Sequence, residues 1–398
     1  MLVTTSQQTE TEVGRDGQLG ILPTKQLVIN DGESPGGHLV TGPVAALTGP
    51  QEVPSETTVE YVIQDLDAFS TYGVTATYGT ATLSDDVITY TAPANRFSDE
   101  LVITRDDIST VYPITIPVTG LTGQYNQLPG GPSRRNVYGI TAYEGYIYLF
   151  GGWDGDSRFN DLWRYSPEDS TWTQLSSTGE IRKDPVIVGI SGKLYMFGGY
   201  PSSGVPMASF WEYDISTDNW TRLPDGPVGM YYHRAVALNN KMYVFGGKST
   251  EGKNNTFWEY DPQSGEWSTL ATGPSERYSP GMCVLGEKIY LFGGDNFKDL
   301  WVYDPQVNEW EELPSGSTER RYHAMGGVGN EIYVFGGLSN GSRINDLWAY
   351  NVIDREWRRM SDGASPRDGI NGAVLNNKMY FFGGYYDNIR YSDFWVIS

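Results

Sequence analysis

Apolar residues fall in short runs throughout the chain, and six runs in its C-terminal part end in the same way. Each of these ends in Tyr-x-Phe-Gly-Gly, at residues 148–152, 195–199, 243–247, 290–294, 333–337 and 380–384. The first glycines of the six copies are therefore 47, 48, 47, 43 and 47 residues apart. A fixed period in this range predicts a repeat architecture in which each unit forms one small β-sheet.

Tryptophans occupy two further constant positions in the repeat. The first follows Leu or Phe in another apolar run, at Trp163, Trp211, Trp258, Trp301, Trp348 and Trp395. In five repeats a second tryptophan follows nine residues later, at Trp172, Trp220, Trp267, Trp310 and Trp357, and the next Gly-Gly begins 26 residues after it. This register resembles the kelch-repeat family over residues 123–398. The resemblance implies a six-bladed β-propeller with four strands per blade, and we expect the tryptophans to pack between blades.

The sixth repeat has no outer strand of its own before Ser398. Counting 26 residues back from Gly151 leads to Tyr125, in a Tyr-Asn-Gln-Leu-Pro segment that parallels the Trp-Thr-Arg-Leu-Pro segment at Trp220. We therefore predict that residues 124–128 supply the outer strand of the last blade. This arrangement closes the ring and leaves no unpaired sheet edge.

The N-terminal part has a different pattern, without tryptophan between residues 25 and 120. Alternating runs separated by turn residues predict strands at 26–30, 57–64, 72–78, 87–91, 101–104 and 111–118. This number of short strands favours a β-sandwich at residues 25–122. The stretch 80–93, with Thr-Tyr-Thr-Ala-Pro at its end, resembles immunoglobulin-like modules of virion and bacterial surface proteins. Residues 1–24 are polar without an apolar period, and we expect them to be an arm that docks onto a neighbouring chain.

Composition narrows the class of protein. The 398 residues carry a formal net charge of −21, which argues against nucleic acid and anionic membrane surfaces as partners. No apolar stretch is long enough for a membrane span. Cys283 is the single cysteine, so no internal disulfide is possible, and the first residues lack the basic and apolar regions of a secretory signal. We therefore expect synthesis in the cytosol.

A column of arginines lies sixteen residues before the first glycine of each repeat. Its members are Arg135, Arg182, Met230, Arg277, Arg320 and Arg367. Propeller symmetry places these side chains around one axis, at the entry to the inner strands. Two interpretations remain open: the arginines bind an anionic ligand, as the resemblance to kelch substrate adaptors implies, or loop carboxylates and backbone carbonyls pair them internally.

The loops after Gly-Gly differ between repeats, as expected of a recognition surface on a repetitive frame. Together with the five arginines we take their polar and aromatic residues as the candidate ligand-binding face: Trp153, Tyr200, Lys248, Asn296, Arg343 and Tyr385. Aromatic, amide and guanidinium groups on one face suit a carbohydrate, above all one with carboxylates. The glycine doublets themselves fit tight turns rather than phosphate loops, because no copy has the following lysine and helix.

The sequence gives little support for catalysis. His233 and His323 share one column but belong to distant blades, so we expect no three-ligand metal site, no cofactor and no enzymatic activity. Motifs of serine hydrolases and zinc proteases are absent from the sequence. An alternative comes from resemblance: six-bladed kelch propellers include bacterial sialic-acid epimerases, which use arginine-rich mouths on an acidic sugar.

Our hypothesis from the sequence is a receptor-binding structural protein, a phage tail fibre or baseplate component located in the virion. Its arm and sandwich would join other virion proteins in an oligomeric assembly, and its propeller would bind a host-surface glycan or protein. Two alternatives remain: the epimerase-like enzyme, and an intracellular kelch scaffold in the cytoplasm that binds a partner protein.

Overall fold

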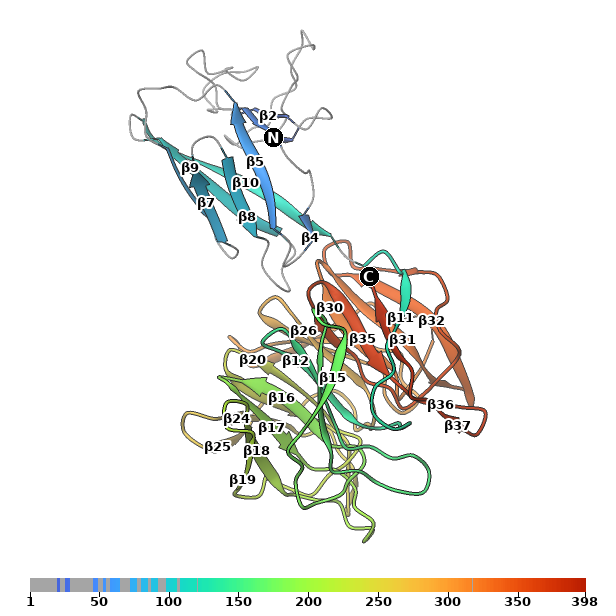
Figure 1. The fold of residues 1–398 in the computed structure, drawn as a ribbon. Helices are drawn as coiled ribbons and strands as arrows, with labels where there is room; N and C mark the ends of the chain where they lie inside the picture. The colour runs from blue at the N-terminus through green and yellow to red at the C-terminus, as the bar shows by residue number, and fades with distance from the viewer. Residues whose placement is uncertain are drawn as a thin grey trace. The chain divides into compact units, whose positions relative to one another are not determined.

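A computed structural model divides the chain into two compact units, Met1–Gly120 and Leu121–Ser398 (Figure 1). The structure describes residues 121–398 apart from Ser317, and the backbone of ten strands within residues 20–119. Each unit is considered by itself. No helix in the described part of the chain is long and apolar enough to cross a bilayer.

The N-terminal unit contains a six-stranded sheet of order β1-β2-β3-β5-β8-β7 and a four-stranded sheet of order β4-β10-β9-β6. Neighbouring strands are antiparallel except for β4 and β10. The strands are β1 (Gly20–Ile21), β2 (Gln26–Val28), β3 (Ala46–Thr48), β4 (Val53–Pro54), β5 (Thr58–Gln64), β6 (Tyr72–Ala76), β7 (Thr80–Ser84), β8 (Val87–Thr91), β9 (Ser98–Arg105) and β10 (Ile108–Thr119). The predicted docking arm, apart from β1, and the side chains of the predicted sandwich lie outside the described residues.

The C-terminal unit is a propeller of six antiparallel four-stranded sheets. Blades one to three are β12 (Gly139–Tyr143), β13 (Tyr146–Phe150), β14 (Leu162–Ser166), β15 (Thr171–Leu175); β16 (Val186–Ile190), β17 (Lys193–Phe197), β18 (Phe210–Asp214), β19 (Asn219–Leu223); and β20 (Arg234–Leu238), β21 (Lys241–Phe245), β24 (Phe257–Asp261), β25 (Glu266–Thr269).

Blades four to six are β26 (Gly281–Leu285), β27 (Lys288–Phe292), β28 (Leu300–Asp304), β29 (Glu309–Leu313); β30 (Ala324–Val328), β31 (Glu331–Ser339), β32 (Ser342–Asn351), β33 (Glu356–Arg359); and β34 (Ala373–Leu375), β35 (Lys378–Phe382), β38 (Phe394–Ile397), β11 (Tyr125–Leu128). Two small hairpins extend the loops of blades three and six: β22 (Lys248–Ser249) with β23 (Gly252–Lys253), and β36 (Tyr385–Tyr386) with β37 (Ile389–Arg390). The first strands of successive blades contact each other around the ring, and β34 contacts β12.

The ring closes through β11, which is the outer strand of blade six. It pairs with β38 in the register Tyr125↔Ile397, and the Thr122 and Gln124 N–H groups both donate to the Ser398 carbonyl, at 2.9 and 3.1 Å. In Figure 1 this teal strand lies beside the C-terminus. The first and last repeats therefore share one sheet, which is where the 26-residue offset placed the missing strand.

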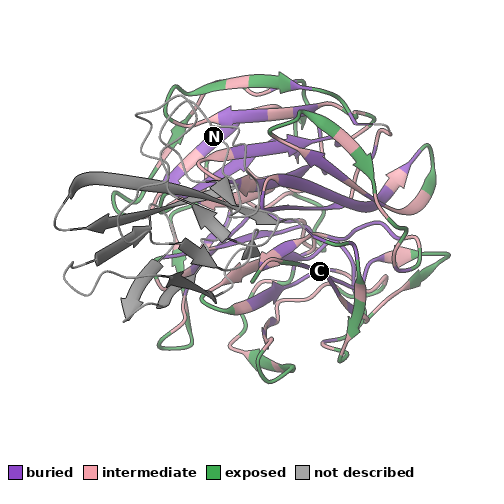
Figure 2. Ribbon diagram, turned by 90° about the horizontal axis from the view of Figure 1, so that it is seen from above, coloured by how far each residue is buried: buried purple, intermediate pink, exposed green. Residues whose placement is uncertain are grey.

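The blades pack through the second tryptophan of each repeat. This side chain lies against the buried phenylalanine of Tyr-x-Phe-Gly-Gly in the preceding blade, with ring centroids 5.1 to 5.9 Å apart: Trp172–Phe382, Trp220–Phe150, Trp267–Phe197, Trp310–Phe245 and Trp357–Phe292. In blade six Tyr125 takes the tryptophan's place, 5.5 Å from Phe335. Buried segments accordingly run through the middle strands, and exposed ones follow the outer strands and loops (Figure 2).

The closure can be tested at Tyr125. Tyr125→Ala removes the aromatic contact that joins blade six to blade five, and we expect a loss of about 2–4 kcal/mol in the free energy of unfolding. Tyr125→Trp restores the side chain found in the other five blades and should change it by less than about 1 kcal/mol. Urea denaturation of both variants measures the difference. Equal stability of Tyr125→Ala and the wild type would contradict closure through this strand.

Candidate functional site

The five arginines of the repeat column are buried, with at most 1% of each residue exposed. Each donates from Nη1 to the carbonyl of the first glycine of its own Gly-Gly, at 2.7 to 3.1 Å. Four also form two hydrogen bonds with an aspartate two residues before the first tryptophan: Asp161, Asp299, Asp346 and Asp393. The same aspartate accepts the tryptophan Nε1–H. We call this arrangement of arginine, glycine carbonyl, aspartate and tryptophan the arginine clasp.

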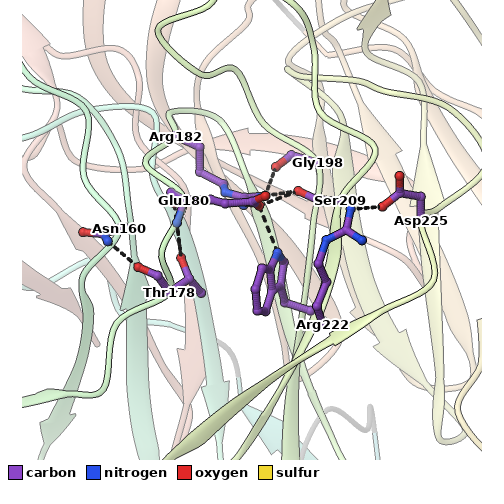
Figure 3. A network of polar contacts seen from close by, with 9 residues as sticks. Asn160, Thr178, Glu180, Arg182, Gly198, Ser209, Arg222 and Asp225 are labelled. Atoms are coloured by element: carbon purple, nitrogen blue, oxygen red, sulfur yellow. Dashed lines mark hydrogen bonds and ion pairs between the residues drawn. The ribbon is translucent and has the colours of Figure 1, made fainter.

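Blade two builds the clasp differently. Ser209 stands where four of the other blades have aspartate, and Glu180 supplies the carboxylate instead (Figure 3). Arg182 binds Glu180, the Ser209 hydroxyl at 3.0 Å and the Gly198 carbonyl at 2.8 Å. Glu180 also accepts the Nε1–H of Trp211 at 3.0 Å.

Blade three lacks both members of the pair, with Met230 at the arginine position and Thr256 at the aspartate position. Arginine and carboxylate are therefore lost together. With the guanidinium groups buried and bonded inside the chain, the structure favours the internal pairing of the arginine column over a direct contact with ligand.

The remaining candidates gather at one end of the propeller, which we call the mouth. In every blade the residue after the arginine column meets the residue after Gly-Gly through backbone hydrogen bonds. The pairs are Asn136/Trp153, Lys183/Tyr200, Tyr231/Lys248, Tyr278/Asp295, Arg321/Leu338 and Asp368/Tyr385. This brings together Trp153, Tyr200, Lys248 and Tyr385, which the sequence indicated.

The other two indicated residues join the same surface. The Arg343 guanidinium lies 4.7 Å from the Tyr385 ring centroid, and its Nε is 3.2 Å from an Asp368 carboxylate oxygen. Asn296 is exposed, and its Oδ1 accepts from Arg321 Nη1 at 3.2 Å.

Cations and aromatic rings alternate around the mouth. The stacked pairs, with the distance from the cation to the ring centroid, are Arg390–Trp153 (4.2 Å), Arg390–Tyr385 (4.7 Å), Lys183–Trp153 (4.9 Å), Lys183–Tyr200 (5.6 Å), Lys183–Tyr232 (5.8 Å), Lys248–Tyr278 (4.0 Å) and Arg321–Tyr322 (5.9 Å). Tyrosines continue the ring between them: Tyr200–Tyr231 (4.5 Å), Tyr231–Tyr232 (4.6 Å), Tyr232–Tyr278 (5.7 Å) and Tyr232–Tyr322 (5.2 Å). Each ring face holds a nearby cation in place electrostatically.

These mouth cations differ from other arginines of the propeller in their partners. Among the described residues, no carboxylate oxygen lies within 4.0 Å of the charged groups of five of them: Arg158, Lys183, Lys248, Arg321 and Arg390. By contrast, outer-strand arginines such as Arg222 and Arg358 are paired with carboxylates. The mouth therefore carries five cations without a direct ion pair, although Asp184 and Asp368 interact electrostatically with some of them and the chain as a whole is acidic.

The next residue in each blade forms the inner rim of the mouth. All six adopt the left-handed backbone conformation, with φ between 50° and 68°: Val137, Asp184, Tyr232, Ser279, Tyr322 and Gly369. Four donate their N–H to the carbonyl at the same position of a neighbouring blade, at 2.7 to 3.1 Å: Val137 to Gly369, Asp184 to Val137, Ser279 to Tyr232 and Tyr322 to Ser279. These bonds offset the cost of about 1–2 kcal/mol for a left-handed residue other than glycine.

Asp184 is the buried acid of this rim, 6% exposed and with no hydrogen-bond partner for Oδ2. Burial raises the pKa of Asp184 to about 7, although Lys183, Arg234 and Arg158 act to lower it. Burial in turn lowers the pKa of Lys183, and Arg158 and Arg390 lower it further, whereas Asp184 raises it.

Sequence reasoning did not assign the mouth residues that directly follow the arginine column, such as Lys183, Tyr231, Tyr278 and Arg321. A signal existed in the fixed offset of fifteen residues before each first glycine. It was weak because five different residue types occupy this position in the six blades.

Family comparisons agree with this architecture. Residues 182–319 and 274–398 match the KLHDC2/KLHL20/DRC7 Kelch-repeats domain, and residues 134–179 match the Kelch motif. The chain belongs to the kelch-repeat family. A solved structure described as the structure of YjhT has the same kelch-like fold, with a TM-score of 0.59 at 18% identity, over 68% of this chain and 96% of the other.

Curated kelch relatives share shorter segments. Mei4-dependent protein 6 of Schizosaccharomyces pombe is 34% identical over 99 residues, which are 22% of this chain and 14% of that protein. Leucine-zipper-like transcriptional regulator 1 of Homo sapiens is 32% identical over 75 residues, 17% of this chain and 9% of the relative. Kelch domain-containing protein 3 of Homo sapiens is 29% identical over 73 residues, 17% and 19% of the two lengths. The chain thus spans less than a fifth of each of these relatives.

The arginine clasp can be tested with the pair that blade three uses. Arg320→Met leaves the Asp346 carboxylate and the Gly336 carbonyl without their main partner, so we expect a loss of about 3–5 kcal/mol in the free energy of unfolding. The double variant Arg320→Met/Asp346→Thr reproduces Met230 and Thr256 and should recover more than half of that loss. Urea denaturation of the single and double variants gives the coupling energy. Additive losses would show that the two side chains act independently.

The buried Asp184 predicts a pH effect on stability. Between its ordinary value of 3.8 and its folded pKa of about 7, the folded chain keeps a proton that the unfolded chain releases. The Asp184 contribution to stability therefore decreases as pH rises through this window, and above about pH 7 a constant penalty remains. Asp184→Asn removes the penalty and keeps a residue that tolerates left-handed backbone.

We expect Asp184→Asn to be more stable than the wild type above about pH 7, by on the order of a few kcal/mol, with the difference vanishing towards about pH 4. Urea denaturation of both proteins across this range measures it. The histidines are common to both proteins, so their effects cancel in the difference. A difference that does not change with pH would refute the assignment to Asp184.

Proposed function

We propose that this kelch propeller is a protein-interaction module without enzymatic activity, whose mouth binds an acidic segment of a partner protein. The observation that carries the proposal is the set of five mouth cations that stack on aromatic rings and have no carboxylate oxygen within 4.0 Å among the described residues. Elsewhere in the described propeller, carboxylates of the same chain neutralise many of the arginines.

An acidic partner gains from this arrangement in two ways. The cations are half-buried and held against rings, so less side-chain entropy is lost when they bind a carboxylate. Charge-assisted hydrogen bonds then form in a partly desolvated surface, where they are stronger than in open water. The net charge of −21 does not prevent this, because salt screens repulsion beyond roughly 8 Å.

The finer assignment to a phage tail or baseplate rests on the resemblance of residues 80–93 to immunoglobulin-like surface modules. The parts of the chain that would carry it, residues 1–24 and the side chains of the N-terminal strands, lie outside the described residues. The proposal therefore stands at the level of a protein-interaction scaffold. Attachment to a host glycan or an epimerase-like activity would require binding of an acidic glycan. The test below includes that result as one of its outcomes.

The test uses the full chain and fluorescently labelled hexaglutamate as the acidic probe. The variant Lys183→Ala/Arg390→Ala removes two mouth cations that flank Trp153. Each charged hydrogen bond contributes about 1.5–3 kcal/mol, so we expect the loss of both cations to weaken binding by roughly a hundredfold or more, as measured by fluorescence anisotropy.

The matched control is Arg222→Ala/Arg359→Ala, which removes the same charge from two exposed arginines on outer strands. Binding by this control should stay close to that of the wild type. If the affinity for hexaglutamate falls equally in both variants, the change in net charge alone explains the loss, and the proposal is overturned. If the wild type binds N-acetylneuraminate more tightly than hexaglutamate, and the mouth variant loses this binding, the ligand is an acidic glycan and not a protein.

A further inference from the structure

Below the mouth the six inner strands enclose a narrow cavity, which we call the throat. Its volume is about 50 Å³, enough for roughly three to five water molecules. Every blade contributes to its lining, and three of the lining side chains carry hydrogen-bonding groups: Arg234, His323 and Asn371.

Arg234 is an exception in its own column. Twelve residues before the first glycine the other five blades have short or apolar side chains: Gly139, Val186, Gly281, Ala324 and Asn371. Arg234 therefore extends its guanidinium into space that four of its counterparts leave free of polar groups. Within the described part of the chain, its side chain makes one hydrogen bond, from Nη1 to the carbonyl of the adjacent His233, at 3.0 Å. Among the described residues it has no ion-pair partner.

Other polar atoms of the throat also lack partners. Among the residues that the structure describes, neither ring nitrogen of His323 has a hydrogen-bond partner, although His323 is only 1% exposed, and the buried Oδ1 of Asn371 has no donor. Burial, Arg320 and Arg234 hold the pKa of His323 well below its usual value. The neutral imidazole then offers one N–H donor and one acceptor beside the guanidinium.

We propose that the throat is a binding site for a single carboxylate, which Arg234 binds through its guanidinium and His323 through its ring N–H. The proposal rests on the proposed function in one respect, because we take the carboxylate to be an acidic side chain of the partner segment held at the mouth. One guanidinium without an internal partner matches one negative charge. The throat therefore fits a monoanion better than a phosphate or sulfate dianion, because the described residues of its lining include no second cationic side chain.

The size of the throat supports the same ligand. A carboxylate occupies about the space of two or three water molecules, and the remaining volume holds a water that can donate to Asn371 Oδ1. A planar carboxylate also matches the fork of N–H donors on a guanidinium.

Acetate is the probe for this site, because it carries one carboxylate and needs no contact with the mouth. Met282 and Met325 line the throat, so their ¹³C-labelled methyl groups report on its contents. Sodium acetate replaces sodium chloride at constant ionic strength in the full chain. We expect both methyl signals to shift saturably in the wild type, and the affinity to fall by at least about tenfold in Arg234→Gln, equivalent to about 1.4 kcal/mol.

Arg164→Gln is the matched control, since Arg164 stacks on Tyr146 at 4.5 Å and also has no ion-pair partner among the described residues. Its acetate titration should match that of the wild type. Unshifted methyl signals in the wild type, or the same affinity in Arg234→Gln, would overturn the throat site. Hexaglutamate binding tests the proposed function separately. If the chain binds acetate through Arg234 but does not bind the peptide, the throat site is supported and the acidic protein partner is excluded.

Discussion

The arginine clasp is the interaction on which the rest of the propeller depends. The Gly-Gly turn places two residues at positive φ at the end of a strand, where the carbonyl of the first glycine needs a donor inside the protein. A buried guanidinium supplies that donor and also binds the aspartate before the third strand, which fixes the first tryptophan. One side chain thus ties together three strands of a blade. Because the guanidinium is buried, its charge needs a partner inside the protein, and the carboxylate supplies it.

The repeated backbone also explains why recognition residues can vary. The residue after the arginine column and the residue after Gly-Gly meet at the mouth through backbone hydrogen bonds in every blade, including blade three, which has no clasp, so their positions do not depend on their own side chains. Lysine, tyrosine, arginine and aspartate can then replace one another at those positions. Mouth cations without an ion-pair partner in the described part of the chain are held by neighbouring rings, which keeps them ordered and still available to a partner.

Much of the fold could be predicted from the sequence, because the repeat gives the same information six times. The Tyr-x-Phe-Gly-Gly period and the paired tryptophans predicted the six kelch blades, and the offset from Gly151 pointed to Tyr125 as the outer strand. The role of the arginine column could not be decided in this way. Its carboxylates come from aspartates in four blades and from Glu180 in another, and repetition alone does not distinguish a column that binds a ligand from one that is paired internally. Lys183 and Arg234 were missed because each stands alone in its column, and a single residue carries no periodic signal.

Blade three shows how the closed ring permits such exceptions. With Met230 and Thr256 it has exchanged a buried ion pair for apolar and short side chains, a replacement that proteins tolerate when both charges leave together. The neighbouring blades still hold it in place. Its first strand β20 contacts the first strands β16 and β26, and Trp267 packs against Phe197 of blade two. The same blade carries Arg234, whose guanidinium has no internal carboxylate. Blade three has Met230 at the clasp position, and its arginine stands four residues later, at Arg234, inside the throat. An arginine at this position can bind a ligand because it is not needed to stabilise the blade.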